Sequence, residues 1–459
     1  ASPASAQDAD EVDEATVITV IARKQTESLQ EVPVTVTAIG GDTLDKYQVN
    51  EIADVVSRVP ALNVQVGGSG SGGQISLRGV GSSNISASFD SAVAFDFDGI
   101  QVSTMRMVQA GFFDVQQIDV LKGPQSLFFG KSASAGVISI RSANPTQEWE
   151  MAGKASYEFE EKGYTIGVRV AAQYQDIEDY VKLAPGTAAF NPDGTVRDSK
   201  GLKNFIGRVT LQWDPSDVFS ANLKLNYVKN KNDGAIGHSD INCGANGVAD
   251  PVYLLSGGLV IPSNADCNDR DGLYHTSDGA PALTSQVPAG SAGKPKFQNG
   301  IPYGETDIFL GRLKWDLDLS DSLTLSSVSG YMSLDAVDTD CYAYVGQFSP
   351  TLPANSGCSD PQNKTEQFSQ ELRIASDFDG MFNFMVGAFY EDRDIDFNTS
   401  QQGVNISFVA PDPVTGYTYD WFKKQNTKTE ALSFFASATL DLTEQLELSG
   451  GLRWTDEKK

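Results

Sequence analysis

Apolar and polar residues alternate along much of the chain from Met151 onward. A period of two places all the apolar side chains of a segment on one face of a β-strand. Roughly ten segments follow this template, which predicts a large and mainly β region. The clearest apolar sets are Phe205, Val209, Leu211 and Trp213; Phe309, Leu313, Trp315, Leu317 and Leu319; Phe434, Ala436, Ala438, Leu440 and Leu442; and Leu446, Leu448, Leu452 and Trp454.

The connections between these segments alternate in length. The short ones are Asp214–Val218, Ser320–Ser322, Ser376–Met381 and Thr443–Gln445, and the long ones are Asn230–Gly304, Ala336–Lys364 and Asp394–Lys428. A transmembrane barrel has short periplasmic turns and long outer loops, whereas a soluble sandwich has no reason to keep its long loops on one side. The pattern therefore favours an antiparallel transmembrane β-barrel over a sandwich. On this interpretation the apolar face meets lipid, and Arg208, Arg312 and Lys314 face a wet lumen.

The residues before about Pro145 have a different pattern, typical of a small mixed α/β domain. Turn residues such as Asp98-Gly99 separate short β-prone runs, and the glycine-rich loop Gly67–Gly73 follows one of them. We expect strands at Val32–Ile39, Leu62–Val66, Ile75–Leu77 and Val93–Phe97, and short helices from Asp42 to Val49 and from Glu51 to Val56.

The segment Phe112–Arg141, FFDVQQIDVLKGPQSLFFGKSASAGVISIR, combines a strand, a tight turn, a loop and a second strand. It resembles the plug domain of TonB-dependent outer-membrane receptors, in which I-x-V-L/I-R/K-G-P, an aromatic-Gly pair and a small-to-β-branched strand recur in this order. The segments VPVTVTAIGGDTL, IADVVSRVPALNVQ, SLRGVGS and FDGIQV match the plug in the same order. The resemblance covers the plug almost fully and the barrel more loosely.

The resemblance implies a mainly β protein: a transmembrane antiparallel β-barrel, here incomplete, with an N-terminal mixed α/β plug. We expect a flexible N-terminus at residues 1–14, a plug at 15–146 and the N-terminal portion of an outer-membrane barrel at 147–459. It also implies a TonB box, a segment that pairs by strand addition with the energy-transducing protein TonB of the inner-membrane complex. The candidate is Ala15, Thr16, Val17, Ile18, Thr19, Val20, Ile21 and Ala22, and the alternative is a plain first strand of the plug.

Composition restricts the partners and the compartment. The 459 residues carry a formal net charge of -26, which opposes binding to nucleic acid, because that affinity depends on basic side chains. No apolar run approaches the roughly 18 residues of a transmembrane helix, so any membrane crossing has to use strands, and outer-membrane lipid is the expected surrounding. Ala4-Ser5-Ala6 resembles the end of a removed secretory signal, with an ordinary disordered start as the alternative. The expected location is the bacterial outer membrane.

Loops supply the candidate binding residues and the cysteines. By the plug resemblance, some plug loops reach the outer mouth, where Met105, Arg106, Met107 and Gln109 are candidate ligand contacts; solvated loop residues are the alternative. All four cysteines lie in the long connections, on the expected outer side, where disulfides persist. Four cysteines allow three pairings. Because local pairing requires the least loop-closure entropy, we expect Cys243–Cys267 and Cys341–Cys358, with free thiols as the alternative.

Nothing in the sequence indicates catalysis, a cofactor or a bound metal. The histidines, His238 and His275, lack a metal-binding spacing, no G-x-S-x-G turn occurs, and Arg270 interrupts a faint calcium-loop pattern at 266–272. The resemblance to TonB-dependent receptors implies active import of a scarce nutrient, with a ferric siderophore or related iron complex expected first, on the family's general substrate range alone, and a saccharide second. A passive porin and a displayed adhesin or enzyme are weaker alternatives. Loop aromatics such as Tyr342, Tyr344 and Phe348 suit either ligand.

The number of strands predicts that this chain is only part of a barrel. A plugged transporter needs about 22 strands, and a barrel of about ten cannot enclose a plug of roughly 130 residues. We therefore expect the natural protein to continue past Lys459 with about a dozen further strands. The strand near Leu446–Trp454 should then have an open edge and should not pair with the strand near Met151–Phe159.

Overall fold

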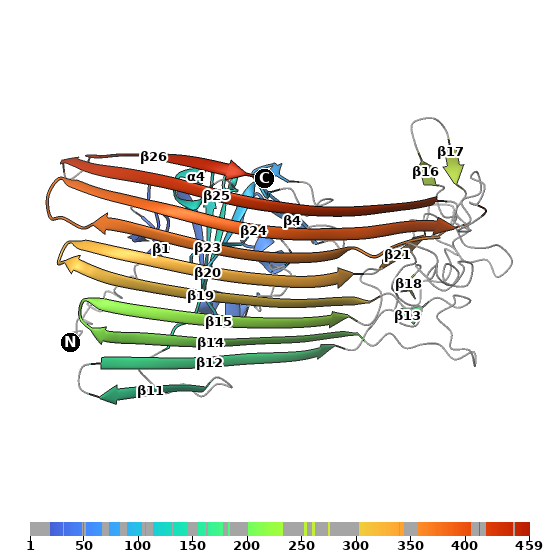
Figure 1. The fold of residues 1–459 in the computed structure, drawn as a ribbon, viewed down its shortest axis with the longest axis horizontal. Coiled ribbons are helices and arrows are strands. Elements are labelled where there is room, and N and C mark those ends of the chain that lie inside the picture. Colours follow the sequence, from blue (N-terminus) through green and yellow to red (C-terminus); the bar gives the residue numbers. More distant parts are fainter. Residues whose placement is uncertain are drawn as a thin grey trace, which may run out of the picture.

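The structure is a computed structural model. It describes residues 19–30, 32–47, 49, 52–66, 73–82, 90–102, 106, 113–130, 132–145, 155–161, 164–177, 182–183, 201–232, 252–254, 259–261, 274–275, 303–338, 340–343, 356–404, 413, 419–443 and 446–459. Within these residues, no helix combines the length and the apolar character needed to cross a bilayer. We call the described residues between 19 and 145 the plug and the long strands after residue 155 the wall (Figure 1).

The central sheet of the plug has five strands in the order β3-β9-β10-β7-β8. They are β3 (Thr35–Gly40), β7 (Val93–Phe97), β8 (Ile100–Val102), β9 (Val115–Lys122) and β10 (Gly136–Ser142). Only the pairing of β10 with β7 is parallel. The strand predicted at Val93–Phe97 has the same bounds as β7, because turn residues flank a short apolar run there. The strand expected from Val32 begins later, at Thr35.

Smaller elements surround this sheet. They are β1 (Thr19–Ile21), β2 (Thr26–Ser28), β4 (Leu62–Val66), β5 (Gly73–Leu77), β6 (Val80–Gly81), and the helices α1 (Gly41–Lys46), α2 (Ile52–Val56) and α4 (Ser126–Phe129). Two expectations were wrong here. Helix α1 ends at Lys46 rather than at Val49, and Phe128-Phe129 belongs to α4 rather than to a loop. Gly130, at φ 77°, ends α4, since glycine adopts this left-handed conformation without a steric penalty.

The wall is an antiparallel meander inside a 12-stranded sheet, in the order β11-β12-β14-β15-β19-β20-β23-β24-β25-β26 (Figure 1). Its strands are β11 (Ala155–Glu161), β12 (Tyr164–Ile177), β14 (Leu202–Ser216), β15 (Phe219–Asn232), β19 (Gly304–Ser320), β20 (Leu323–Asp338), β23 (Gln362–Ser376), β24 (Phe382–Val404), β25 (Tyr419–Thr443) and β26 (Leu446–Lys458). The roughly ten strands predicted from alternation are therefore present. The short turns lie together at one end of the wall, as expected (Figure 1).

The other end of the wall carries the long connections. Short pairs there are β13 (Lys182–Leu183) with β18 (Tyr274–His275), β16 (Val252–Leu254) with β17 (Leu259–Ile261), and β21 (Asp340–Ala343) with β22 (Ser356–Ser359). The hairpin β21–β22 extends the sheet by pairing with β24. The connection expected from Asp394 to Lys428 is shorter than predicted, because β24 and β25 continue the ladder to Val404 and from Tyr419. Polar residues in these strand ends hid them from the alternation pattern.

The wall has its apolar side chains outside and its polar side chains inside. On β23, Thr365, Gln367 and Ser369 are buried, whereas the alternate residues Phe368 and Leu372 are 43% and 44% exposed. In a soluble sheet the apolar side chains are buried and the polar ones exposed, so the wall has the opposite pattern. It matches a barrel in lipid, whose apolar residues face outward. The expected outward apolar face is confirmed.

The two edge strands of the wall do not pair with each other. Within the described residues, β26 pairs with β25 alone and β11 with β12 alone. The sheet is therefore open between β26 and β11, as the strand count predicts.

The plug packs directly against the inner face of the wall. The core cluster that contains Ile100 and Val102 of the plug also contains Leu310, Val328 and Met332 of β19 and β20. A Cβ atom added at Gly330 of β20 would lie 2.9 Å from Ile100 Cγ1 and 2.8 Å from Ser369 Oγ. Glycine at position 330 thus lets the plug approach the wall closely.

We predict that Gly330→Ala loosens the plug without unfolding the wall. The added methyl group displaces Ile100, and such overpacking costs about 1–3 kcal/mol. Limited proteolysis of the purified protein should cut the plug faster than in the wild type. The matched control is Gly311→Ala on β19, where an added Cβ meets only ordinary contacts of 3.4–3.5 Å. Equal cleavage rates in the two variants would contradict this account.

Candidate functional site

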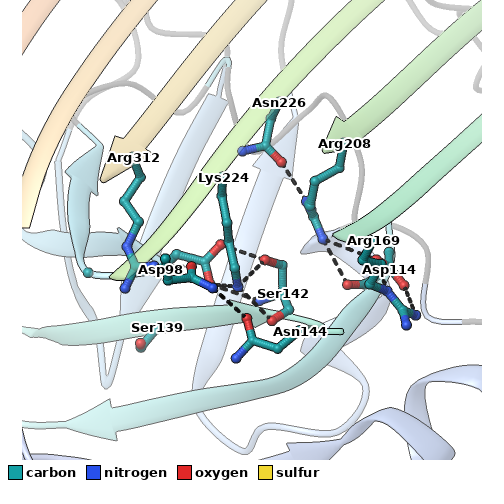
Figure 2. A network of polar contacts seen from close by, with 12 residues as sticks. Asp98, Asp114, Ser139, Ser142, Asn144, Arg169, Arg208, Lys224, Asn226 and Arg312 are labelled. Carbon is teal, nitrogen blue, oxygen red and sulfur yellow. Dashed lines mark hydrogen bonds and ion pairs between the residues drawn. The ribbon is translucent and has the colours of Figure 1, made fainter. Parts of the chain in front are cut away.

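The boundary between plug and wall is held by buried ion pairs (Figure 2). Lys224 of β15 donates hydrogen bonds to Asp98 Oδ1 (3.0 Å), Ser142 O (3.0 Å) and Ser142 Oγ (2.8 Å). Its side chain is 3% exposed and that of Asp98 is 6% exposed. All three N–H donors of the ammonium group therefore have acceptors on the plug, which compensates for its removal from water.

Asp98 lies in the turn between β7 and β8 and has φ 52°. Its carboxylate also accepts hydrogen bonds from Ser142 N (3.0 Å) and Ser142 Oγ (2.6 Å). Burial alone would raise the pKa of Asp98, but the nearby charges of Lys224, Arg312 and Arg208 outweigh it, and the pKa is lowered. The carboxylate is thus held in its ionised form against the wall.

A second contact joins the plug to β12 and β14. Asp114, just before β9, accepts two parallel hydrogen bonds from Arg169, from Nε at 3.0 Å and from Nη2 at 2.8 Å. Arg208 Nη1 donates to the Asp114 backbone O (2.8 Å), and Arg208 Nε donates to Asn226 Oδ1 (2.5 Å). This bidentate pair fixes both the position and the orientation of the plug. Arg208 faces inward as expected, but the prediction of a wet lumen around it was wrong: the plug buries it to 4% exposure.

The described end of the candidate TonB box lies against the plug. Strand β1 pairs with β2 in an antiparallel ladder, and Val20 and Ala22 are fully buried in the cluster that contains Leu121. The Thr19 O atom accepts hydrogen bonds from Gln117 Nε2 (2.8 Å) and from Arg141 Nη2 (3.2 Å). Ala15, Thr16, Val17 and Ile18 lie outside the described residues.

Asp119 of β9 receives the other backbone contact of this strand. Its Oδ2 atom accepts a hydrogen bond from Ile21 N (3.4 Å) and forms an ion pair with Arg141 (3.3 Å). Burial raises the pKa of Asp119, and the hydrogen bond from Gln117 and the charge of Arg141 oppose this only in part. Strand β1 is therefore attached to the plug through a buried polar group that is costly to leave unpaired.

Basic residues that follow β1 connect it to the wall. Lys24 Nζ lies 3.1 Å from Glu371 of β23, which also pairs with Arg373 at 3.0 Å, and Arg23 pairs with Glu447 of β26 at 3.0 Å. Lys24 has φ 63°, a conformation that non-glycine residues adopt rarely. The N-terminal segment thus contacts the plug and the wall at once.

At the long-loop end, the structure places one of the four candidate ligand residues. Arg106 is 2% exposed and forms an ion pair with Asp338, the last residue of β20. This puts a plug loop at the outer end of the wall, as expected. Met105, Met107 and Gln109 lie outside the described residues, and the ligand role of all four stays a prediction.

The cysteines and histidines are only partly described. Cys341 of β21 is the Cα partner of Cys358 of β22, and directly opposed residues in an antiparallel ladder have a Cα separation that a disulfide can span. Cys243, Cys267 and His238 lie outside the described residues, and His275 ends the short strand β18. In the described part of the chain, no group of His, Cys, Asp and Glu is arranged to hold a metal ion.

The buried ion pairs were missed in the sequence, although one signal pointed to them. Alternation placed Arg208 and Arg312 on the inner face, and Lys224 occupies the same phase of β15. A basic residue that faces a filled lumen requires an acidic partner. Asp98 was predicted only as a turn residue and Asp114 was given no role, and nothing local in the sequence marks either as such a partner.

Two family models match the chain. The TonB-dependent receptor plug domain matches residues 28–137, and the TonB-dependent receptor-like β-barrel matches residues 256–459. The pesticin receptor of Yersinia pestis is 24% identical over 454 residues, which cover 97% of this chain and 56% of that protein. The chain therefore spans about half the length of the curated relatives it matches.

Solved structures share the fold. The ferric yersiniabactin uptake receptor FyuA of Yersinia pestis has a TM-score of 0.62 at 19% identity, covering 92% of this chain and 56% of that chain. The ferripyoverdine receptor of Pseudomonas aeruginosa has a TM-score of 0.64 at 14% identity, covering 96% and 54%. Each is a plug-containing receptor barrel with the arrangement seen here.

We predict that Asp98→Asn weakens the attachment of the plug and changes its pH dependence. Because the folded-state pKa of Asp98 is lowered, its ionised form stabilises the fold fully above the ordinary carboxyl pKa of about 3.9. This stability is lost as the pH falls through the lower folded-state value. Breaking a buried pair costs about 3–5 kcal/mol, so D98N should unfold at less urea at neutral pH.

The measurement is the urea midpoint of plug unfolding, followed by a fluorophore on the plug, between about pH 6 and pH 3. The variant should lose less stability than the wild type across the acidic part of this range. The matched control, Asp42→Asn in α1, changes an exposed carboxyl and should behave like the wild type. If D98N and D42N have the same midpoints at neutral pH, Asp98 does not hold the plug.

We also predict a disulfide between Cys341 and Cys358 and a second one between Cys243 and Cys267. Each bridge should stabilise its loop by ~3 kcal/mol through restriction of the unfolded chain. Peptide mapping without reduction identifies the pairs. Cross-linked peptides that join the two loops, or free thiols in protein isolated from the cell surface, would show the prediction to be wrong.

Proposed function

The chain belongs to the TonB-dependent receptors, and from this membership we propose that its protein imports a scarce nutrient across the bacterial outer membrane with energy supplied through TonB. Members of this family are outer-membrane receptors, which agrees with the outward apolar face of the wall. The observation that carries the proposal is the plug itself. A folded domain is seated inside the wall by buried ion pairs, and its N-terminal strand is attached to both.

A plug held in this way argues against the passive porin, because a diffusion pore requires an open lumen. Active opening of the plug requires a segment that TonB can bind, and the candidate is β1 together with the residues before it. We retain Ala15–Ala22 as the proposed TonB box and residues 15–146 and 147–459 as the proposed plug and barrel portions. We propose that TonB adds a strand to this segment, an interaction in which main-chain hydrogen bonds supply the affinity.

The proposed substrate is a ferric siderophore or a related iron complex. Similar proteins support it, since two of the solved structures that share the fold are receptors for ferric yersiniabactin and ferripyoverdine. The proposed contacts remain Arg106 with Met105, Met107 and Gln109, together with the outer loops. A saccharide remains the alternative substrate. In either case transport requires no covalent change of the substrate, and we propose a receptor rather than an enzyme.

We predict that Ile18→Pro abolishes uptake but leaves binding at the cell surface intact. Proline removes one main-chain donor and fixes φ, which disrupts strand addition. The assay measures binding and uptake of radiolabelled ferric siderophores of the catecholate, hydroxamate and carboxylate classes by cells that express the protein. Ile18→Val is the matched control, because it keeps the donor and the β-propensity.

A proton uncoupler should reduce uptake by the wild type to the level of the Ile18→Pro variant. Uptake that persists under the uncoupler contradicts active import and favours the porin. Uptake of an oligosaccharide panel, with no uptake of any iron complex, favours the alternative substrate.

A further inference from the structure

A polar cavity of about 350 Å³ separates the plug from the middle of the wall. Its wall-side residues lie on β14, β15, β19, β20 and β23, so β11 and β12 separate it from one open edge and β24, β25 and β26 from the other. Ser220, next to the start of β15, and Asp316, near the end of β19, place it toward the short turns. Ile21, Lys24 and Gln25 of the N-terminal segment form part of its lining.

Basic side chains predominate in this cavity, although the chain as a whole is strongly acidic. Three acidic residues line it, namely Asp96, Asp98 and Asp316. The basic residues that line it are Lys24, Arg141, Lys224, Arg312, Lys314 and Arg373. The local excess of positive charge therefore cannot be explained by composition.

Five of the six basic residues have a carboxylate partner. Lys24 and Arg373 share Glu371, and the other three pairs are Arg141–Asp119, Lys224–Asp98 and Lys314–Asp316. Arg312 differs from them. It donates one hydrogen bond, from Nη1 to Asn222 Oδ1 at 2.6 Å, and within the described residues no carboxylate oxygen lies within 4.0 Å of it.

The remaining N–H donors of Arg312 have no hydrogen-bond partner among the described residues. Its Nε atom is buried and, in the described part of the chain, has no hydrogen-bond partner. A guanidinium group has five N–H donors in a rigid fork that matches a carboxylate. A buried donor without a partner is costly, so this arginine is poised to bind an anion.

Asp96 is one of the acidic residues that line the cavity. It is buried and hydrogen-bonded to Ser139 Oγ (3.1 Å) and Gly99 N (3.1 Å). Burial raises its pKa, and the charge of Lys24 and the two hydrogen bonds oppose this only in part.

We propose that this cavity binds small carboxylate-bearing anions through Arg312. Its volume lies at the lower end of the roughly 300–1,000 Å³ typical of ligand pockets, so it suits a small acid or one anionic arm of a larger chelate. The bidentate match between guanidinium and carboxylate supplies the specificity.

The position of the cavity gives it a role in transport, and this part rests on the proposed function. Lys24 and Gln25 belong to the segment that follows β1, so a pull on β1 removes one side of the lining. The cavity is then a second binding station for an anionic ligand, between the plug and the periplasmic turns. Arg312 positions the ligand there after it has left the outer loops.

The first test measures citrate binding to the purified protein in detergent by calorimetry. Arg312→Gln should weaken citrate binding about tenfold or more, because hydrogen bonds to a charged group contribute a factor of that size. Arg312→Lys keeps the charge but loses the fork and should bind with intermediate affinity. The matched control is Lys229→Gln, since Lys229 lies at the outer end of β15 with its side chain 38% exposed.

Two results overturn the binding proposal: citrate affinity unchanged in Arg312→Gln, or no saturable citrate binding by the wild type. Retained heat-modifiable migration on gels verifies that each variant is folded. A loss of citrate binding by Lys229→Gln equal to that of Arg312→Gln likewise contradicts a specific site.

The second test separates the cavity from the proposed function. Uptake of a radiolabelled ferric carboxylate siderophore should fall about tenfold in Arg312→Gln, with surface binding unchanged. Uncoupler-sensitive uptake that does not change in Arg312→Gln contradicts the transport role of the cavity and leaves active import intact. Uptake that is insensitive to the uncoupler contradicts active import itself, and the citrate measurement still decides the binding site.

Discussion

Buried ion pairs hold the plug against the wall. In each pair one charged residue belongs to the plug and the other to the wall. Lys224 and Asp98 are both almost inaccessible to solvent, as are Arg169 and Asp114. In both pairs one charge comes from the plug and the other from the wall, so the ion pairs form only when the plug is seated. A buried ion pair contributes little net stability relative to apolar packing, but an unpaired buried charge is strongly destabilising. The ion pairs therefore specify one position of the plug inside the wall, and they add little to the net free energy of binding between the two.

This arrangement also bears on the plug movement that the proposed function requires. When apolar surfaces separate, the cost rises with the area exposed to water. When buried ion pairs separate and water enters between them, water replaces the lost partner, so the cost is smaller than that of leaving each charge buried and unpaired. A boundary held by Asp–Lys and Asp–Arg contacts thus suits the proposed function, in which the plug stays closed until TonB pulls on it. An apolar cluster around Ile100 and Val328 also joins the plug to the wall.

The N-terminal segment is where force would enter this system. Thr19 and Ile21 are hydrogen-bonded to Gln117 and Asp119 of β9, in the central sheet of the plug, while Lys24 is paired with Glu371 of the wall. A displacement of this segment acts on both domains together. It also acts on the positively charged cavity, since Lys24 is part of its lining. A single element therefore connects the proposed partner contact, the seat of the plug and the cavity around Arg312.

The sequence by itself determined the wall, its outward apolar face and most plug strands. These features depend on local periodicity: a residue two positions along a strand returns to the same face, whatever stands opposite. It therefore placed Arg208 and Arg312 on the inner face and β7 at Val93–Phe97. Only the tertiary structure decided what those arginines meet. Asp98 and Lys224 are 126 residues apart, and Asp114 and Arg208 are 94 residues apart. A charged side chain on the inner face can be hydrated, paired or left with spare hydrogen-bond donors. The outcome depends on which distant segment packs against it, and no local pattern in the sequence encodes that.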